Sequence, residues 1–210
     1  MMPLWGGIIA LVVAVFITLS QWWGLVLAAN PPPEEELFSS KMERLRAAQY
    51  ALDVGDNGKV LTFEGEFTHG VTKRIANLIA ENPQLETVTL TSPGGNIFEA
   101  RGVAQQIFSA ELDTHAAGDC SSACTLVFVA GRGRTAAPDA RLGFHGYALL
   151  NAAQLPQFDV EAEQDRDRAF FVQQGVTDAF AKRMYDQPNP SIWFPTREEL
   201  LEASVLRGRK

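Results

Sequence analysis

The chain contains the sequence Thr91-Ser92-Pro93-Gly94-Gly95-Asn96, a turn with two adjacent glycines. Downstream, a pair of serines lies between the only two cysteines, in Cys120-Ser121-Ser122-Ala123-Cys124. A histidine follows in Gly143-Phe144-His145-Gly146. A turn with free amides, a nucleophilic hydroxyl and an imidazole base are the groups that acyl transfer of the serine hydrolase type requires.

Ser122 is the candidate nucleophile, and His145 is the candidate base that it needs, because a serine hydroxyl is hardly ionised at neutral pH. At the start of a buried helix, the Ser122 hydroxyl would lie at the helix N-terminus, and the Ala123 amide would face the same point. Ser121 has the same chemistry, but its side chain would point elsewhere. Taken singly, a capping serine, a structural histidine and an ordinary glycine turn are simpler interpretations. The combination favours a catalytic site.

Strand and helix patterns alternate along the middle of the chain. Short strands are expected over residues 60–63, 87–91, 112–116 and 141–145, and helices over 69–81, 97–108 and 123–130. A charged helical region follows from residue 152 to 180. This order predicts an α/β fold with a mostly parallel sheet covered by helices.

The N-terminal part of the chain predicts a membrane segment. Residues 4–29 carry no charge, and about 20 apolar residues are enough to span a bilayer. Trp5 and Trp22-Trp23 lie near its two ends, as interfacial aromatics do. We expect a transmembrane signal-anchor over residues 1–29, with a signal peptide cleaved after Val26-Leu27-Ala28 as the alternative. With either the anchor or the signal peptide, the rest of the chain is exported. It is expected to consist of a Pro/Glu-rich spacer and lead-in helix over residues 30–54, followed by a domain over residues 55–210.

Charge and cysteine content narrow the possible partners. A net charge of −7 and a pI near 5.0 argue against nucleic-acid binding, which needs clustered basic residues. An exported location permits a Cys120–Cys124 disulfide, since side chains four apart on a helix approach within about 5–6 Å. Two reduced, packed thiols are the alternative. A zinc site would need further ligands, so we expect neither metal nor cofactor.

The order of these motifs resembles that of the ClpP protease and the wider ClpP/crotonase superfamily, over residues 60–145 with a weaker similarity to Leu206. The segments VLTFEGEF (60–67) and IANLIAENPQLETVTLTSPGGNIFEA (75–100) are similar to the first βαβ unit of that family. GDCSSACTLVFVAG (118–131) resembles its nucleophile helix, and RTAAPDARLGFHGY (134–147) its histidine strand. The Cys-x-Ser-Ala-Cys version is more similar to exported or membrane-anchored ClpP-like proteins of bacteria.

This resemblance implies a serine peptidase domain of ClpP/crotonase-like fold over residues 55–210, in which Ser122 attacks a peptide bond and His145 is the base. It also implies that the amides of Gly95 and Ala123 form the oxyanion hole, with Gly94 in contact with substrate.

The third triad residue of the family, an aspartate, corresponds to a position near Ser191, with Asn189 and Asp186 as neighbours. The resemblance further implies peptide or protein substrates and homo-oligomers. It places the domain at the bacterial inner membrane, facing the periplasm or exterior, or in a secreted form after signal cleavage.

Two other functions stay open at this point. A binding or scaffold protein of the cell envelope could have kept the fold without catalysis, because no aspartate stands at the third position and the imidazole would be poorly oriented. A crotonase-like acyl-CoA enzyme is the other. The Ser–His pair and export away from the cytoplasmic CoA pool both argue against it.

Overall fold

The computed structural model of the 210-residue chain describes residues 49–55, 57–147, 159–188 and 191–208. The membrane segment expected over residues 1–29 and most of the spacer lie outside these ranges, so the anchor and the cleavable signal both stay predictions. Within the described ranges, no helix is long and apolar enough to cross a membrane.

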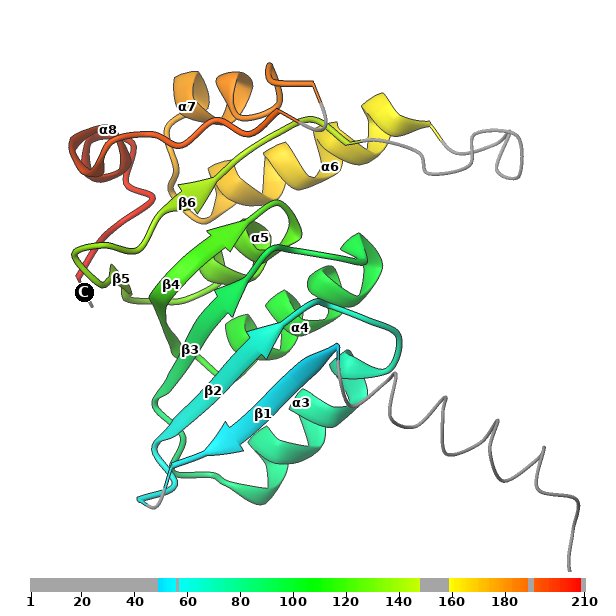
Figure 1. The fold of residues 1–210 in the computed structure, drawn as a ribbon, viewed down its shortest axis with the longest axis vertical. Coiled ribbons are helices and arrows are strands. Elements are labelled where there is room, and N and C mark those ends of the chain that lie inside the picture. Colours follow the sequence, from blue (N-terminus) through cyan, green and yellow to red (C-terminus); the bar gives the residue numbers. More distant parts are fainter. Residues whose placement is uncertain (1–48, 56, 148–158, 189–190, 209–210) are drawn as a thin grey trace, which may run out of the picture. The chain divides into compact units, whose positions relative to one another are not determined.

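A six-stranded sheet forms the centre of the domain, and its first five strands lie side by side in chain order (Figure 1). Strand β1 runs antiparallel to β2, whereas all the other pairings are parallel. The α/β fold with a mostly parallel sheet is therefore confirmed. The strands are β1 (Tyr50–Val54), β2 (Val60–Gly65), β3 (Thr87–Ser92), β4 (Asp113–Ser121), β5 (Arg134–Ala136) and β6 (Leu142–Gly143).

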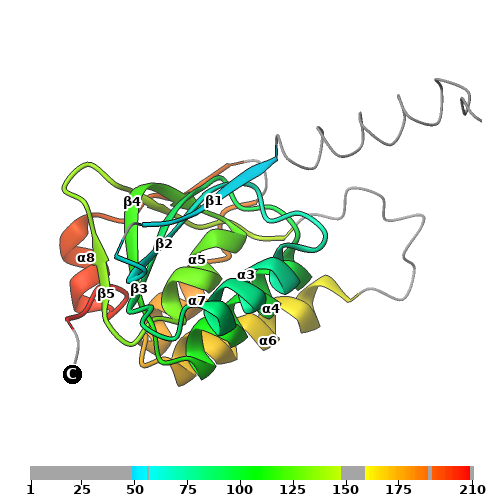
Figure 2. The same ribbon diagram turned by 90° about the horizontal axis from the view of Figure 1, so that it is seen from below.

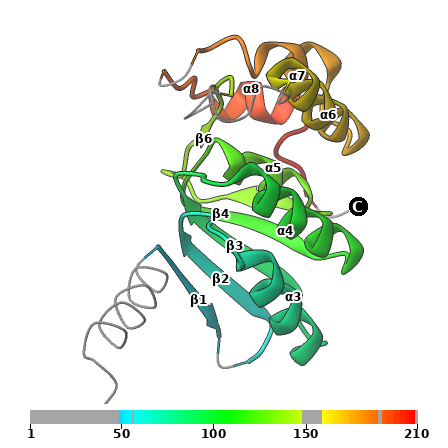
Figure 3. The same ribbon diagram turned by 90° about the vertical axis from the view of Figure 1, so that its right-hand side faces the viewer.

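Helices α3 (Val71–Glu81), α4 (Ile97–Ser109) and α5 (Ala123–Val129) pack on one face of this sheet (Figures 2 and 3). Alternate residues of β2 and β3 are buried, as strands with one covered face require. Every residue of α5 is buried, which explains its continuous apolar sequence. The chain ends with α6 (Val160–Gln173), α7 (Asp178–Arg183) and α8 (Arg197–Glu202).

The lead-in helix expected within residues 30–54 is wrong at its C-terminal end, because residues Tyr50–Val54 form strand β1. Their burial alternates with a period of two, and each residue pairs with one of β2. Pairing along an existing strand outweighs the helix propensity of this short stretch. Strand β1 consequently belongs to the same sheet as the strands that follow residue 55.

A fully buried arginine joins the ends of three helices. The Arg134 guanidinium donates to the carbonyls of Val129 (2.8 Å), Gln174 (3.3 Å) and Ser204, at the C-terminal ends of α5, α6 and α8. Helix C-termini leave such carbonyls without partners inside the helix. Burial and the charge of Arg207 lower the pKa of Arg134 to about 9, which still leaves the side chain protonated at neutral pH.

Replacing Arg134 with methionine should lower the free energy of unfolding by about 3 kcal/mol, because buried carbonyls lose their donors. Urea denaturation measures this loss. Arg132→Met is the matched control, since the Arg132 side chain is 45% exposed and pairs with Glu111 at the surface. It should cost less than about 1 kcal/mol. Equal losses in the two variants would show that Arg134 does not hold the helices together.

Candidate active site

Ser122 occupies a strained turn between β4 and α5. Its backbone has φ 56° and ψ −127°, a conformation that costs a non-glycine residue on the order of 1–3 kcal/mol. Two contacts hold it there: the Ser122 amide donates to the Gly143 carbonyl (2.8 Å), and the Ser122 carbonyl accepts from the Thr125 hydroxyl (2.7 Å). Serine nucleophiles at strand-to-helix turns are held in such conformations, which expose the hydroxyl.

The two neighbouring serines face different surroundings. Ser121 is buried, and a Cβ added to Gly143 would lie only 2.5 Å from the Ser121 hydroxyl. Its side chain therefore points at β6. Ser122 is half-buried and lines a pocket. The structure thus places Ser122, and not Ser121, at the cavity, as the sequence predicted.

An irregularity in β4 brings this turn next to the strand that leads to His145. Along β3 the register advances two residues, from Leu90 to Ser92, while along β4 it advances four, from Ala116 to Cys120. Extra residues in one strand bend it and end its regular pairing. Beyond this bulge, Cys120 and the next residue pair with β6, in parallel. Parallel pairing brings the C-terminal ends of β4 and β6 to the same edge of the sheet.

The glycine turn packs directly against Ser122. Gly94 is buried with φ 110°, and a Cβ there would lie 2.7 Å from the Ser122 Cβ and 2.9 Å from the Ser121 carbonyl. Only glycine fits such a close approach at positive φ. Gly94 therefore lies beside the candidate nucleophile, as expected of a residue in the substrate-binding turn.

The direction of the Gly95 amide follows from the hydrogen bonds of its neighbours. Phe67, which follows β2, donates to the Gly94 carbonyl (2.8 Å) and accepts from the Asn96 amide (2.7 Å). Successive amides of an extended chain point to opposite sides, so the Gly95 N–H points away from Phe67. Because β3 lies between β2 and β4, that side is where Ser122 begins α5. Gly95 is exposed.

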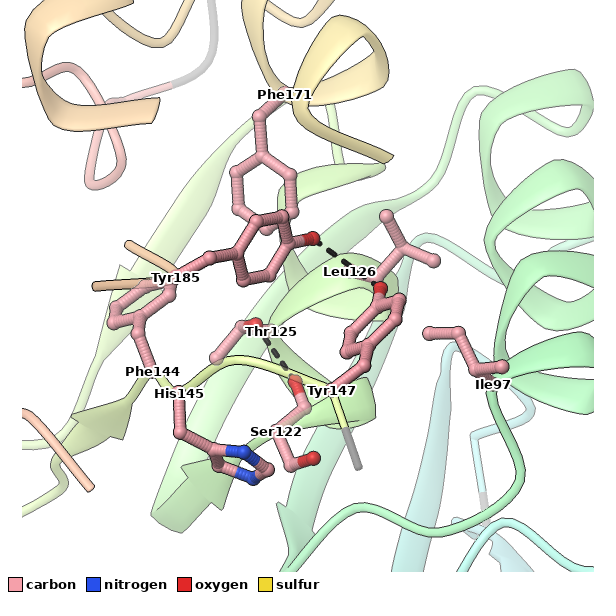
Figure 4. Close-up of a pocket in the computed structure, with 9 residues that line it drawn as sticks. All are labelled: Ile97, Ser122, Thr125, Leu126, Phe144, His145, Tyr147, Phe171 and Tyr185. Atoms are coloured by element: carbon pink, nitrogen blue, oxygen red, sulfur yellow. Dashed lines mark hydrogen bonds between the residues drawn. The ribbon is translucent and has the colours of Figure 1, made fainter. Parts of the chain in front are cut away.

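Ser122 and His145 line one narrow pocket, which has room for about one water molecule. Figure 4 shows the Ser122 side chain next to the imidazole, with the hydroxyl turned to the side away from the ring. Rotation about the Cα–Cβ bond would direct it at the ring. The remaining wall is mostly apolar and consists of Ile97, Thr125, Leu126, Phe144, Tyr147, Phe171 and Tyr185.

The imidazole of His145 is oriented by the backbone that follows it. Its Nδ1 lies 2.7 Å from the Gly146 carbonyl. A carbonyl only accepts hydrogen bonds, so we assign the proton to Nδ1, which leaves Nε2 as the acceptor. The Gly146 amide in turn donates to the Gln187 carbonyl at 2.6 Å. His145 thus has the tautomer that a general base needs.

Ser191, the expected third member, is not brought into the pocket. It is exposed, and its amide donates to the Pro188 carbonyl at 2.8 Å. The following segment pairs Trp193 with Phe144, which leaves Ser191 at the surface. Asp186 is also exposed and does not line the pocket, while Asn189 lies outside the described residues.

The two cysteines form a disulfide that spans the Ser122 turn, with Cα atoms 5.3 Å apart. The expectation that both lie on one helix is wrong, because Cys120 belongs to β4 and only Cys124 lies in α5. Both are fully buried. The bridge closes a five-residue ring around the nucleophile, which restricts the backbone on both sides of it. No cluster of three or more metal-binding side chains occurs in the described part of the chain.

The sequence motifs did not identify the pocket wall. Tyr147 lies two residues after His145, and this proximity was the one local signal for it. Phe171 and Tyr185 come from α6 and from the residues after α7, and nothing in the sequence connects those helices to Ser122.

Comparison with known proteins supports the fold at the level of structure. No protein-family model matches the sequence, and no curated protein does. A solved structure of a ClpP1 mutant from Listeria monocytogenes matches with a TM-score of 0.59 and 12% sequence identity, covering 71% of this chain and 90% of that chain. The chain therefore has a ClpP-like fold.

Replacing Gly94 with alanine should lower the free energy of unfolding by about 1–3 kcal/mol more than the same change at Gly70. Both glycines have positive φ, but a Cβ at Gly70 meets nothing within 4 Å. The difference between the two variants therefore isolates the crowding against Ser122. Chemical denaturation measures it, and equal losses would contradict the close approach.

Removing the bridge with the double change Cys120→Ala, Cys124→Ala should lower the free energy of unfolding by about 2 kcal/mol, as closing a short loop predicts. Reductant should lower the free energy of unfolding of the wild type in urea titrations, whereas that of the variant should be the same with and without reductant. Two titratable thiols in the oxidised, denatured wild type would show that the bridge is absent.

Proposed function

We propose that this protein is a ClpP-like serine peptidase of the bacterial cell envelope. It hydrolyses peptide bonds through an acyl-enzyme formed on Ser122, with His145 as the general base. The observation that carries the proposal is the strained Ser122 turn, which opens into the same pocket as His145 and packs against Gly94.

The reaction follows from the orientation of these groups. Nε2 of His145 takes the proton from the Ser122 hydroxyl as the oxygen attacks the peptide carbonyl. The amides of Gly95 and Ala123 donate to the carbonyl oxygen as it becomes negative, and loss of one such donor typically costs about 100- to 1000-fold in rate. The imidazolium then gives its proton to the leaving amine, and water, activated by the same base, releases the acyl group.

The pocket has room for about one water molecule, so a peptide side chain next to the cleaved bond would have to displace its mostly apolar wall. The envelope location rests on the uncharged run over residues 4–29 and on a disulfide, which persists in oxidising compartments. By the resemblance of its motifs to ClpP, we also propose that the domain assembles into homo-oligomers.

A second candidate function is that of a non-catalytic binding or scaffold protein of the envelope. One observation favours it: none of the described residues that line the pocket is a carboxylate. The orientation of His145 by the Gly146 carbonyl favours the peptidase instead.

A fluorophosphonate probe distinguishes these two functions, because it reacts covalently only with an activated serine. The wild type should be labelled, and Ser122→Ala should abolish labelling. Ser121→Ala is the matched control and should leave labelling intact, since that side chain points at β6. Mass spectrometry of the labelled peptide identifies the modified serine. A wild type that is folded yet unlabelled would favour the scaffold function.

A further inference from the structure

A buried ion pair lies behind the candidate pocket, between α4 and α6. Arg101 donates to both oxygens of Asp167, at 2.7 Å from Nε and 2.9 Å from Nη2, and Asp167 is 2% exposed. Arg101 also donates to Glu163. Burial opposes the charge of Arg101, but the hydrogen bonds and charges of the two carboxylates outweigh it and raise its pKa. Breaking a buried pair would leave a charge without a partner, so the pair holds the two helices in a fixed position.

Tyr147 connects this ion pair to the His145 segment. Its hydroxyl donates to Asp167, and the Tyr185 hydroxyl lies 3.2 Å from that of Tyr147 (Figure 4). Burial raises the pKa of both tyrosines, as does the charge of Asp167. Both therefore keep their protons. Since the single proton of Tyr147 goes to Asp167, Tyr185 must donate to Tyr147.

A second contact from α6 holds the backbone of the same residue. The Tyr147 amide donates to the Gln164 side-chain oxygen at 2.7 Å. Gln164 and Asp167 are three residues apart on α6, so they lie on one face of that helix. One helix face therefore binds both the amide and the hydroxyl of Tyr147.

The amide that Gln164 binds and the carbonyl that His145 contacts belong to one peptide unit. That unit joins Gly146 to Tyr147, and a peptide bond is planar, so fixing its N–H also fixes the direction of its C=O. The same C=O accepts from Nδ1 of His145 at 2.7 Å. The orientation of the imidazole thus depends on contacts that originate in α6.

We propose that Gln164, Tyr147 and Asp167 are positioning residues for His145. They fix the Gly146–Tyr147 peptide so that its carbonyl accepts from Nδ1 and holds the imidazole in one orientation, the task that an aspartate performs in a Ser-His-Asp triad. The inference rests on the proposed peptidase function. Residues that support a reacting group from behind act by holding it in place, and misplacement of about 1 Å can cost about 100-fold in rate.

Two variants of the full chain test this inference, Tyr147→Phe and Gln164→Met. Tyr147→Phe removes the hydroxyl contacts to Asp167 and Tyr185, and Gln164→Met removes the contact to the Tyr147 amide. Both leave the Arg101–Asp167 pair intact, so either one suffices if the other fails to fold. We expect the first-order rate of fluorophosphonate inactivation to fall about 10- to 100-fold, with the concentration for half-maximal rate unchanged. Tyr50→Phe is the matched control. Tyr50 lies in the edge strand β1, where its ring packs on Phe63 of β2, so this variant should keep the wild-type rate.

Nitrogen-15 NMR of the histidine side chains gives a readout that a purely structural role would not change. The wild type should show His145 with its proton on Nδ1, and both variants should shift it towards the Nε2 tautomer. If both variants keep the wild-type inactivation rate and the wild-type tautomer, the inference is overturned, while the proposed peptidase function is unaffected. If the wild type itself is unlabelled, the proposed function fails, and the tautomer shift alone decides whether these residues position His145.

Discussion

The hydrogen bond from the Ser122 amide to the Gly143 carbonyl connects the two halves of the candidate site. It lies where β4 and β6 end, and each strand is followed within two residues by one member of the candidate pair, Ser122 or His145. The same contact also fixes the backbone amide of Ser122, whose conformation is strained. One hydrogen bond therefore maintains both the strained turn and the position of Ser122 near His145. Without this pairing, the turn could relax and the two side chains would separate.

Three neighbouring parallel strands, β3, β4 and β6, bring the glycine turn, Ser122 and His145 to the same edge of the sheet. The glycine turn follows β3, the serine turn follows β4, and the histidine follows β6. Side chains and amides at the C-terminal ends of parallel strands meet in this way in many α/β proteins. The bulge in β4 is the local adjustment that lets one strand pair with β3 along its first part and with β6 at its end.

Much of this arrangement could be predicted from the sequence, because the signals were local. Local patterns predicted α3, α4 and α5, the last from its position after a turn, and the resemblance of the motifs predicted that Ser122, Gly95 and His145 share a site. The contacts made by the C-terminal helices could not be predicted. Asp167 and Gln164 lie in a strongly charged helix where nothing distinguishes a buried carboxylate from a solvated one. Strand β1 was missed because its residues continue the helical pattern of the preceding segment, and their pairing with β2 is a contact that a local pattern does not show.

Helix α6 is held near its middle and at its C-terminal end by two arginines, and this explains how it can support a site to which it contributes no reacting group. Near its middle, Asp167 binds Arg101 of α4, and at its C-terminal end the Gln174 carbonyl accepts from Arg134. Burying charged groups is costly, and each arginine is stabilised by several acceptors, so neither can move without losing them. These contacts fix α6 relative to the sheet. A carbonyl oriented from such a rigid support can direct an imidazole as firmly as a separate carboxylate, although it lacks the negative charge that stabilises an imidazolium.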